Sequence, residues 1–368
     1  METAILFVLV LGLLFVGVPV AVSLGLSSIL LIAFFSNDSM SSVAIQLFTA
    51  SQNYTLLAIP FFVLASAFMS TGGVAKRIIR FAIATVGHFR GGLAMASVLA
   101  CMLFAALSGS SPATVVAIGT IAIAGMRQVG YSKDFAAGII ANAGTLGILI
   151  PPSIVMVVYS AATDVSVGRM FLAGVIPGIV AGLMLMTAIY IVARIKGLPA
   201  EPWRGFSEIL NGGKEAGWGL FLIIIIIGGI YGGVFTVNEA AAVGAILSIV
   251  FALLRGRLSW ARFLGCLVEA GRNTGMIYLI IFGAEMMSYF VTVTGAPQAF
   301  TAFIEATGWP PLMIVAAFVL MYVVLGSVFD TIAAMLITLP FVLPVIESLG
   351  YDVVWWGIVT VAVVELGM

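Results

Sequence analysis

The sequence has little of what disulfide-stapled domains and metalloenzymes need. Only 8% of its 368 residues are charged, and it contains two cysteines and one histidine. Cys101 and Cys266 lie in apolar segments and are too few for a disulfide framework, so we interpret them as packing residues. His88 alone cannot build a multi-histidine centre, so we expect no transition-metal site.

Further absences narrow the class of activity. The chain has no Gly-Lys-Ser/Thr phosphate loop, which excludes ATP as its energy source. Its formal net charge is zero, so nothing points to nucleic acid. An intramembrane serine protease needs a histidine in a span, whereas His88 lies in a basic loop, where we expect a solvated side chain. An aspartyl protease needs two intramembrane aspartates, and Asp330 stands alone. We therefore expect no enzyme and no organic cofactor.

Apolar residues dominate what is present. They make up 62% of the chain, and the mean hydropathy is +1.25, which places the protein in the lipid bilayer. Runs such as 221–227 and 313–325 lack the alternation of a barrel strand and predict helices. The segment 1–14 has no Lys or Arg, so we expect a retained helix rather than a signal peptide. The run 4–35 is either one tilted helix or two helices joined at 17–19. The fold class is all-α and polytopic.

Two stretches of the chain, 109–114 and 326–331, look like copies of each other. Equivalent positions are 217 residues apart there and 220 apart further on. The matched pairs are Gly109 and Gly326, Thr114 and Thr331, Gly130 and Gly350, Tyr131 and Tyr351, and Gly147 and Gly367. Small and polar interruptions that recur in two apolar halves are typical of a transporter's binding site.

The basic residues predict how the first copy lies in the membrane. All fifteen Lys and Arg fall between Lys76 and Arg272, and the positive-inside rule puts loops 75–91 and 126–134 in the cytoplasm. The apolar segment 92–125 between them must begin and end on the same side. Its break at 108–112 leaves about sixteen residues on each side, too few for two comfortable spans. We interpret it as a re-entrant helical hairpin entered from the cytoplasm.

The second copy has the opposite sidedness. Helix 275–293 starts just after Arg272, and the last 96 residues contain no Lys or Arg. The hairpin 311–346, with its tip at 326–331, would then enter from outside. A repeated motif with opposite sidedness is an inverted-topology repeat.

This pattern divides the chain into five parts. They are N-terminal scaffold helices (1–75), a first transport core with hairpin 92–125 and broken helix 135–160 (76–193), a cytoplasmic linker (194–217), scaffold helices with a short interfacial helix at about 259–272 (218–274), and a second transport core with hairpin 311–346 (275–368). At an offset of 220, the partner of Pro151-Pro152 would fall after Met368. We therefore expect a C-terminally truncated second core, short by roughly 45 residues on repeat arithmetic.

The two tips carry the candidate ligands. Hydroxyls and exposed carbonyls suit a hard cation such as Na⁺, and each tip faces a broken helix. Asp330 is the strongest single candidate for an ion ligand, because an ionisable group at membrane depth is costly and is usually functional. The alternative is a protonated Asp330 with a structural role. Glu285 also lies in a span, and a structural role is as plausible there as a role in transport.

Five stretches together resemble one family. They are Val86–Leu93, Ser108–Thr114, Ile150–Ser153, Gly229–Gly244 and Asp330–Pro340. They resemble the large membrane subunit, of DctM type, of tripartite ATP-independent periplasmic (TRAP) transporters. The resemblance implies an elevator-type, Na⁺-driven member of the ion transporter superfamily in the bacterial inner membrane. It also implies a small four-helix partner of DctQ type and a periplasmic binding protein of DctP type that delivers an organic acid.

The resemblance also implies ligand sets. The first Na⁺ site would comprise Ser108, Gly109, Ser110, Ser111, Gly144, Thr145, Gly147 and Pro151, and the second Gly326, Ser327, Asp330, Thr331 and Gly367. Ser110, Ser153 and Asp330 would face the substrate. The leading prediction is Na⁺-coupled import of a small carboxylate handed over by a binding protein. The alternatives are a stand-alone dicarboxylate symporter, an anion exporter and, less suited to closed tips, an ion channel.

Overall fold

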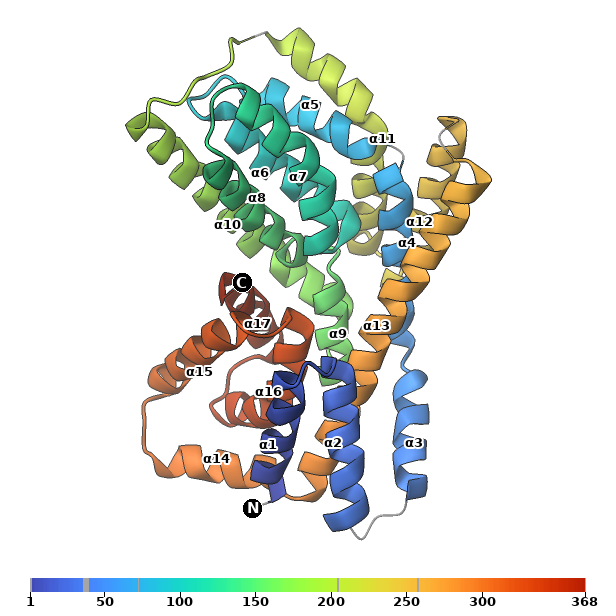
Figure 1. Cartoon of the computed structure of the whole chain (residues 1–368), viewed down its shortest axis with the longest axis vertical. Coiled ribbons are helices and arrows are strands. Elements are labelled where there is room, and N and C mark those ends of the chain that lie inside the picture. The colour runs from blue at the N-terminus through green and yellow to red at the C-terminus, as the bar shows by residue number, and fades with distance from the viewer. Residues whose placement is uncertain (1, 36–39, 72, 204, 257, 368) are drawn as a thin grey trace. The chain divides into compact units, whose positions relative to one another are not determined.

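A computed structural model describes residues 2–35, 40–71, 73–203, 205–256 and 258–367 (Figure 1). Within these ranges the chain forms seventeen α-helices and one 3₁₀ helix, with no strand. Six described helical stretches are long and apolar enough to cross a membrane, or seven if the bent pair 41–51 and 54–70 counts as one span. The protein is therefore an all-helical, multi-pass membrane protein.

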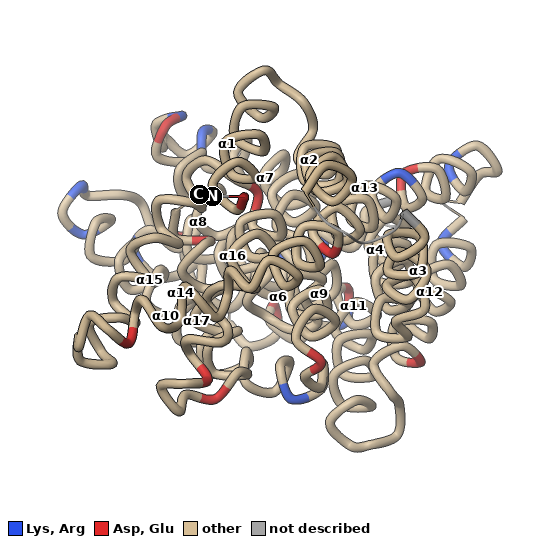
Figure 2. The backbone as a smooth tube through the Cα atoms, turned by 90° about the horizontal axis from the view of Figure 1, so that it is seen from below, with Lys and Arg blue, Asp and Glu red and all other residues tan. Residues whose placement is uncertain are grey.

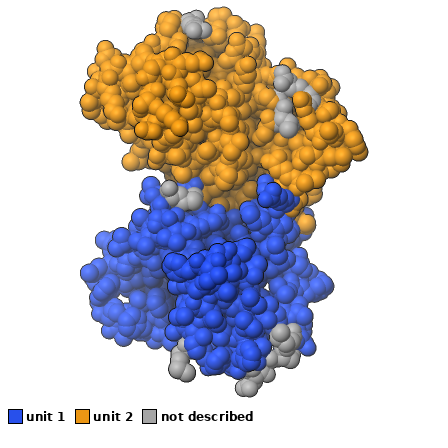
Figure 3. All heavy atoms as spheres, in the orientation of Figure 1, with its two compact units in different colours: residues 1–56, 158–165, 272–368 blue, residues 57–157, 166–271 orange. Residues whose placement is uncertain are grey.

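The chain forms two compact units, coloured separately in Figure 3. Unit 1 comprises residues 1–56, 158–165 and 272–368, and unit 2 comprises residues 57–157 and 166–271. Three elements are shared between them: η1 (Tyr54–Leu57), α9 (Ile154–Thr163) and α13 (Trp260–Val293). Each unit holds one of the two repeated motifs.

Unit 2 is built around the first motif. Its helices are α4 (Ala58–Thr71), α5 (Val74–Val86), α6 (Gly92–Ser108), α7 (Ser111–Gln128), α8 (Lys133–Leu149), α10 (Val167–Ile195), α11 (Phe206–Tyr231) and α12 (Val237–Leu254). Helices α6, α7 and α8 pack on one another. Their core contains many small side chains, which let the helices approach closely as membrane helices do.

Unit 1 is built around the second motif. Its helices are α1 (Glu2–Phe15), α2 (Val20–Phe35), α3 (Met40–Ser51), α14 (Ala296–Ala306), α15 (Pro311–Gly326), α16 (Thr331–Ser348) and α17 (Val353–Gly367). Helices α15, α16 and α17 pack on one another, around a core that includes Phe318, Tyr322 and Trp356. The apolar run 4–35 is thus two helices, separated at Gly17, whose φ of +89° suits glycine.

Two expectations about element boundaries are wrong, and the predicted linker is partly helical. No separate interfacial helix lies at 259–272, because α13 runs unbroken through 34 residues that contain no proline. The linker 194–217 is mostly helical, since only 196–205 lies between α10 and α11. The loop 75–91 is largely α5, which buries Val74, Ala75, Ile78, Ile79 and Ala82 along one side. That spacing is the stripe of an amphipathic helix.

Charge is sparse along the whole molecule, as the few coloured positions in Figure 2 show. It is also unevenly shared. Fourteen of the fifteen Lys and Arg belong to unit 2, whereas nine of the fifteen Asp and Glu belong to unit 1. The formal net charge is therefore −8 for unit 1 and +8 for unit 2.

Candidate functional site

The first tip joins α6 to α7 through two residues. Gly109 has a φ of +60°, in the left-handed region, and Ser110 is extended and precedes the first residue of α7. A Cβ atom on Gly109 would lie 2.7 Å from the carbonyl oxygen of Pro152. Conformation and space thus both require glycine at this turn, which seats the tip on the break between α8 and α9.

Hydroxyl groups and carbonyls hold the first tip together and join it to α8 and α9. The Ser108 and Thr114 hydroxyls lie 3.0 Å apart, and the Thr114 hydroxyl donates to the Ser110 carbonyl over 2.9 Å. The Ser111 hydroxyl donates to the Thr145 carbonyl over 3.5 Å. In return, the amide of Ile154, the first residue of α9, donates to the Gly109 carbonyl over 3.2 Å. The tip is a buried cluster of neutral oxygen atoms.

Glycines on α8 allow this approach. A Cβ atom on Gly147 would lie 3.0 Å from Cα of Ser111, and Gly144 lies directly against the side chain of Val115. Pro151 forms a cis peptide bond with Pro152 at the break. Ser153 is fully buried, and its hydroxyl accepts the amide of Met156 at the start of α9 over 3.4 Å. The residues predicted for the first site therefore come together at one place, with Ser153 beside it.

The second tip, between α15 and α16, also has glycines at close backbone approaches, though between other positions than in the first. Gly326, the last residue of α15, lies against the carbonyl of Val364 on α17. A Cβ atom on Gly367 would lie 3.0 Å from Cα of Gly326. The Ser327 side chain is exposed, and its hydroxyl donates to the Val324 carbonyl over 2.7 Å.

Asp330 acts as a helix cap. It is the N-cap residue of α16, it is exposed, and its carboxylate accepts the amide of Ile332 over 3.1 Å. A carboxylate at a helix N-terminus satisfies an unpaired amide and interacts favourably with the helix dipole. The structure thus gives Asp330 a structural contact, and its role with an ion stays a prediction.

The sequence reasoning missed Glu365. This residue of α17 is 7% exposed, and its carboxylate accepts the Thr331 hydroxyl over 3.2 Å. The signal was available, because the 220-residue offset makes Glu365 the counterpart of Thr145, whose carbonyl accepts the Ser111 hydroxyl. The second tip therefore has two carboxylates near it, whereas the first has none among its contacts described above.

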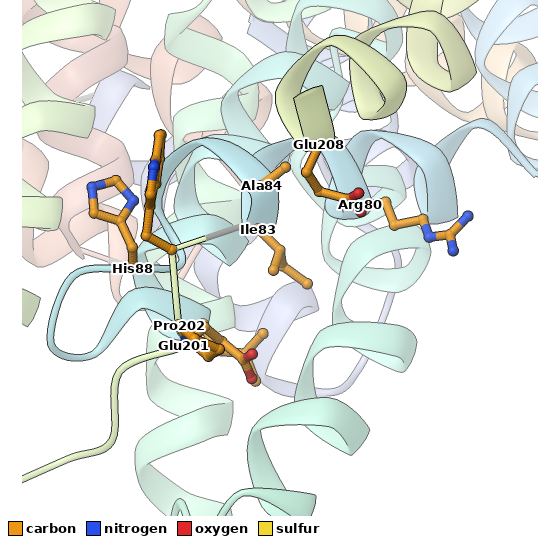
Figure 4. Close-up of a pocket in the computed structure, with 9 residues that line it drawn as sticks. Arg80, Ile83, Ala84, His88, Glu201, Pro202 and Glu208 are labelled. Carbon is orange, nitrogen blue, oxygen red and sulfur yellow. The ribbon is translucent and has the colours of Figure 1, made fainter. Parts of the chain in front are cut away.

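A cavity of about 250 Å³ lies elsewhere in unit 2, and Figure 4 shows the residues around it. It is lined by Arg80, His88, Glu201 and Glu208 among others. His88 is half-buried and packs against Phe89 in a tilted arrangement and against Trp203 edge to face, with ring centroids 4.1 and 4.6 Å away. The prediction of a solvated His88 side chain is therefore wrong.

The segment 196–205 is fastened to the turn after α5. The amide of Glu201 donates to the Gly87 carbonyl over 3.0 Å, and the amide of Gly91 donates to the Pro199 carbonyl over 3.2 Å. These contacts, with the edge-to-face packing of Trp203 against His88, explain why the histidine is half-buried. They give His88 a structural place within unit 2, outside the first tip.

Comparisons with known proteins agree on one family. The model of the "Tripartite ATP-independent periplasmic transporter, DctM component" matches residues 7–368. The chain is 54% identical to the C4-dicarboxylate TRAP transporter large permease protein DctM of Vibrio cholerae, over 100% of this chain and 86% of the relative. It is 52% identical to the protein of the same name from Pseudomonas aeruginosa, over 94% of this chain and 81% of the relative.

A solved structure shares the fold. MtrF of Neisseria gonorrhoeae, described as one of a class of antimetabolite efflux pumps, superposes with a TM-score of 0.64. The match covers 89% of this chain and 72% of that protein at 12% sequence identity. At this identity the likeness concerns the fold alone.

Proposed function

The chain belongs to the DctM component family of tripartite ATP-independent periplasmic transporters, and from this premise we propose that it is the permease of a Na⁺-coupled C4-dicarboxylate importer in the bacterial inner membrane. The family is one of transporters, so the chain is not an enzyme. The observation that carries the substrate class is the high identity, over the whole chain, to a permease named for C4-dicarboxylates.

The two tips support Na⁺ as the coupling ion. Na⁺ is a hard cation that prefers oxygen ligands, and helix ends with freed carbonyls provide them in transporters. The first tip gathers the hydroxyls of Ser108 and Ser111 around Gly109, which lies against the break at Pro152. The second adds the carboxylates of Asp330 and Glu365. The donor atoms at both tips fit Na⁺ and offer no soft ligand.

The duplicated packing supports alternating access. In each unit two hairpin helices pack on a third helix, with glycine at both close approaches. We propose that the copies are inverted repeats, that each hairpin is re-entrant, and that they move the substrate by an elevator mechanism. We further propose that Ser110, Ser153 and Asp330 face the substrate, whose two carboxylates would be attracted to helix N-termini.

The term tripartite in the family name supports two partners. We propose a small membrane subunit of DctQ type and a periplasmic binding protein of DctP type that delivers the substrate. Under this proposal the binding protein sets much of the selectivity, because it presents only what it has bound.

The test is uptake by vesicles that contain the permease and its small subunit. Radiolabelled succinate serves as the C4-dicarboxylate, with the binding protein outside and either a Na⁺ or a K⁺ gradient imposed. We expect uptake only with the binding protein and an inward Na⁺ gradient. A monocarboxylate of similar size is the substrate control.

Two outcomes would contradict the proposal. Uptake without the binding protein would favour a stand-alone symporter. Uptake that is equal in Na⁺ and K⁺ gradients would contradict Na⁺ as the coupling ion and the proposed role of both tips as Na⁺ sites.

A further inference from the structure

A cavity in unit 1 lies outside both tips. It has a volume of about 200 Å³ and is bounded by α13, α16 and Ala162 of α9. Both α13 and α16 are long and apolar enough to cross a membrane. Its walls are mostly Ala, Leu and Pro side chains, with Glu285 and Ser288 of α13 as the polar exceptions.

Glu285 needs a partner at this position. A charged carboxylate at membrane depth is costly unless a counter-charge compensates it. The only Lys or Arg of unit 1 is Arg272, which lies thirteen residues earlier on the same helix, about 20 Å away at 1.5 Å per residue. The side chain of Gln46 on α3 hydrogen-bonds Glu285, while Asp164 adds further negative charge. Neither neighbour neutralises the carboxylate.

The opposite wall provides carbonyl oxygens. Helix α16 continues through Pro340 and Pro344, which have no amide hydrogen. Pro340 therefore cannot donate to the carbonyl of Leu336, and Pro344 cannot donate to that of Pro340. Leu336, Pro340 and Pro344 are spaced by four residues and all line the cavity. The face of α16 that lacks these two helical hydrogen bonds is thus the face that borders the cavity.

Two walls with complementary chemistry meet here. Residues 285 and 288 are three apart and share a face of α13. Both line the same cavity as Leu336 and Pro340, the two residues of α16 whose carbonyls lose their helical amide partner to proline. Such carbonyls are tolerated in the membrane where neighbouring groups or a water-filled cavity satisfy them. Oxygen ligands with one negative charge are what a small hard cation requires.

We propose that this cavity binds a hard monovalent cation, with Glu285 as its charged ligand, Ser288 as a neutral ligand and the carbonyls of Leu336 and Pro340 completing it. The site is separate from the two tips and does not depend on their role. An ion here would bridge α13 to α16 and stabilise their packing.

The experiment measures the thermal unfolding midpoint of the purified chain in detergent as NaCl replaces choline chloride at constant total salt. Ligand that binds only the folded state raises the midpoint. Glu285→Gln keeps the size of the side chain and can still bond Gln46, so it tests the charge alone. We expect it to raise the half-saturating Na⁺ concentration by at least about tenfold, as loss of an interaction at a metal site does.

Two further variants approach the site from its other ligands. Pro340→Ala returns an amide to α16 and occupies the Leu336 carbonyl, and Ser288→Ala removes the hydroxyl. Both should weaken the response to Na⁺, Ser288→Ala less than Glu285→Gln. Glu305→Gln is the matched control, because Glu305 is an exposed acidic residue of the same unit on α14. It should leave the Na⁺ titration unchanged.

The test is independent of the tips. In protein that carries both Ser108→Ala and Thr331→Val, the part of the Na⁺ response that depends on Glu285 must persist. A Na⁺ titration of Glu285→Gln that superimposes on that of the unchanged protein overturns the proposal. A second outcome also overturns the proposal: Glu285→Gln releases the small subunit while the Na⁺ response stays unaltered. The carboxylate would then pair with a basic side chain of that subunit rather than with an ion.

Discussion

The tips of the two helical hairpins share a backbone arrangement but differ in side-chain chemistry. Gly109, just after α6, lies against the carbonyl of Pro152 at the break, and Gly326, the last residue of α15, lies against the carbonyl of Val364 on α17. The first tip is held by hydroxyl-to-hydroxyl and hydroxyl-to-carbonyl contacts. The second is held by a hydroxyl that donates to a carboxylate, next to a carboxylate that caps a helix.

The helices that precede the hairpins differ in a related way. Helix α5 carries Lys76, Arg77 and Arg80, whereas α14 carries Glu305 and no Lys or Arg. The difference teaches that the two regions resemble each other in their glycines and helix packing but not in charge. Such a difference in charge is expected if the two regions are the inverted copies that we propose, because basic residues favour the cytoplasmic side of a membrane.

The largest expected effect concerns this sidedness and is all-or-none. Cysteines at the exposed positions Arg90 and Glu305, in a protein with Cys101 and Cys266 replaced by alanine, should react with an impermeant maleimide from opposite faces of the membrane. The measurement is labelling of intact spheroplasts compared with inverted vesicles. Labelling of both positions from one face would break the comparison, since the copies would not be inverted.

The next effect tests whether the shared glycines define the motif. Gly109→Ala must place a side chain at a φ of +60° and 2.7 Å from the Pro152 carbonyl. We expect it to lose about 1–3 kcal/mol from overpacking and about 1–2 kcal/mol from backbone strain. Gly326→Ala should lose the overpacking part alone. The free energy of unfolding in denaturant measures both.

The controls are glycines with open space. Gly217→Ala on α11 and Gly275→Ala on α13 place a methyl group where no heavy atom lies within 4 Å. Both should leave stability the same or improve it, because alanine favours helix more than glycine does. Equal losses at controls and tips would show that the close approaches do not matter.

A smaller effect separates the chemistry of the tips. Thr331→Val removes the hydroxyl that donates to Glu365 and should cost about 1.5–3 kcal/mol, as for hydrogen bonds to charged groups. Thr114→Val breaks a neutral hydroxyl pair and should cost about 0.5–1.5 kcal/mol. Both changes keep a β-branched side chain of similar volume. Unfolding in denaturant should therefore rank Thr331→Val as the more damaging; the reverse order would mean that Glu365 does not depend on this bond.

The sequence predicts the helical class and both hairpin tips, because Gly, Ser and Pro stand out inside apolar runs. The expected break at 108–112 contains the observed turn, since α6 ends at Ser108 and α7 begins at Ser111. The predictions are weakest where a polar segment was interpreted as a loop or linker although it forms a helix. Helix α5 is polar on one side only and buries its apolar residues, whereas the start of α11 buries only the small residues Gly212 and Ala216.

Long-range pairings are the other limit. The Thr331–Glu365 contact spans 34 residues, and the cavity beside Glu285 needs residues of α9, α13 and α16. Only the packing of helices brings such residues together, so a single sequence can identify them as candidates but cannot predict their contacts. Asp330 is easy to find in the sequence, because it is an isolated charge in an apolar run. Its hydrogen bond to the Ile332 amide, which caps α16, could not be predicted from the sequence.

The smallest expected change in stability separates the two roles of Asp330. Asparagine caps a helix about as well as aspartate does, whereas replacement of the cap by alanine costs about 0.5–2 kcal/mol. Asp330→Asn should therefore keep the stability of the unchanged protein, and Asp330→Ala should lose about 1 kcal/mol.

If the carboxylate also contributes to an ion site, both variants should raise the Na⁺ concentration for half-maximal uptake. Docking of the binding protein, measured by its concentration dependence, should stay the same. Uptake by Asp330→Asn with an unaltered Na⁺ response would leave the residue with its cap alone, and the charge at the second tip would then rest on Glu365.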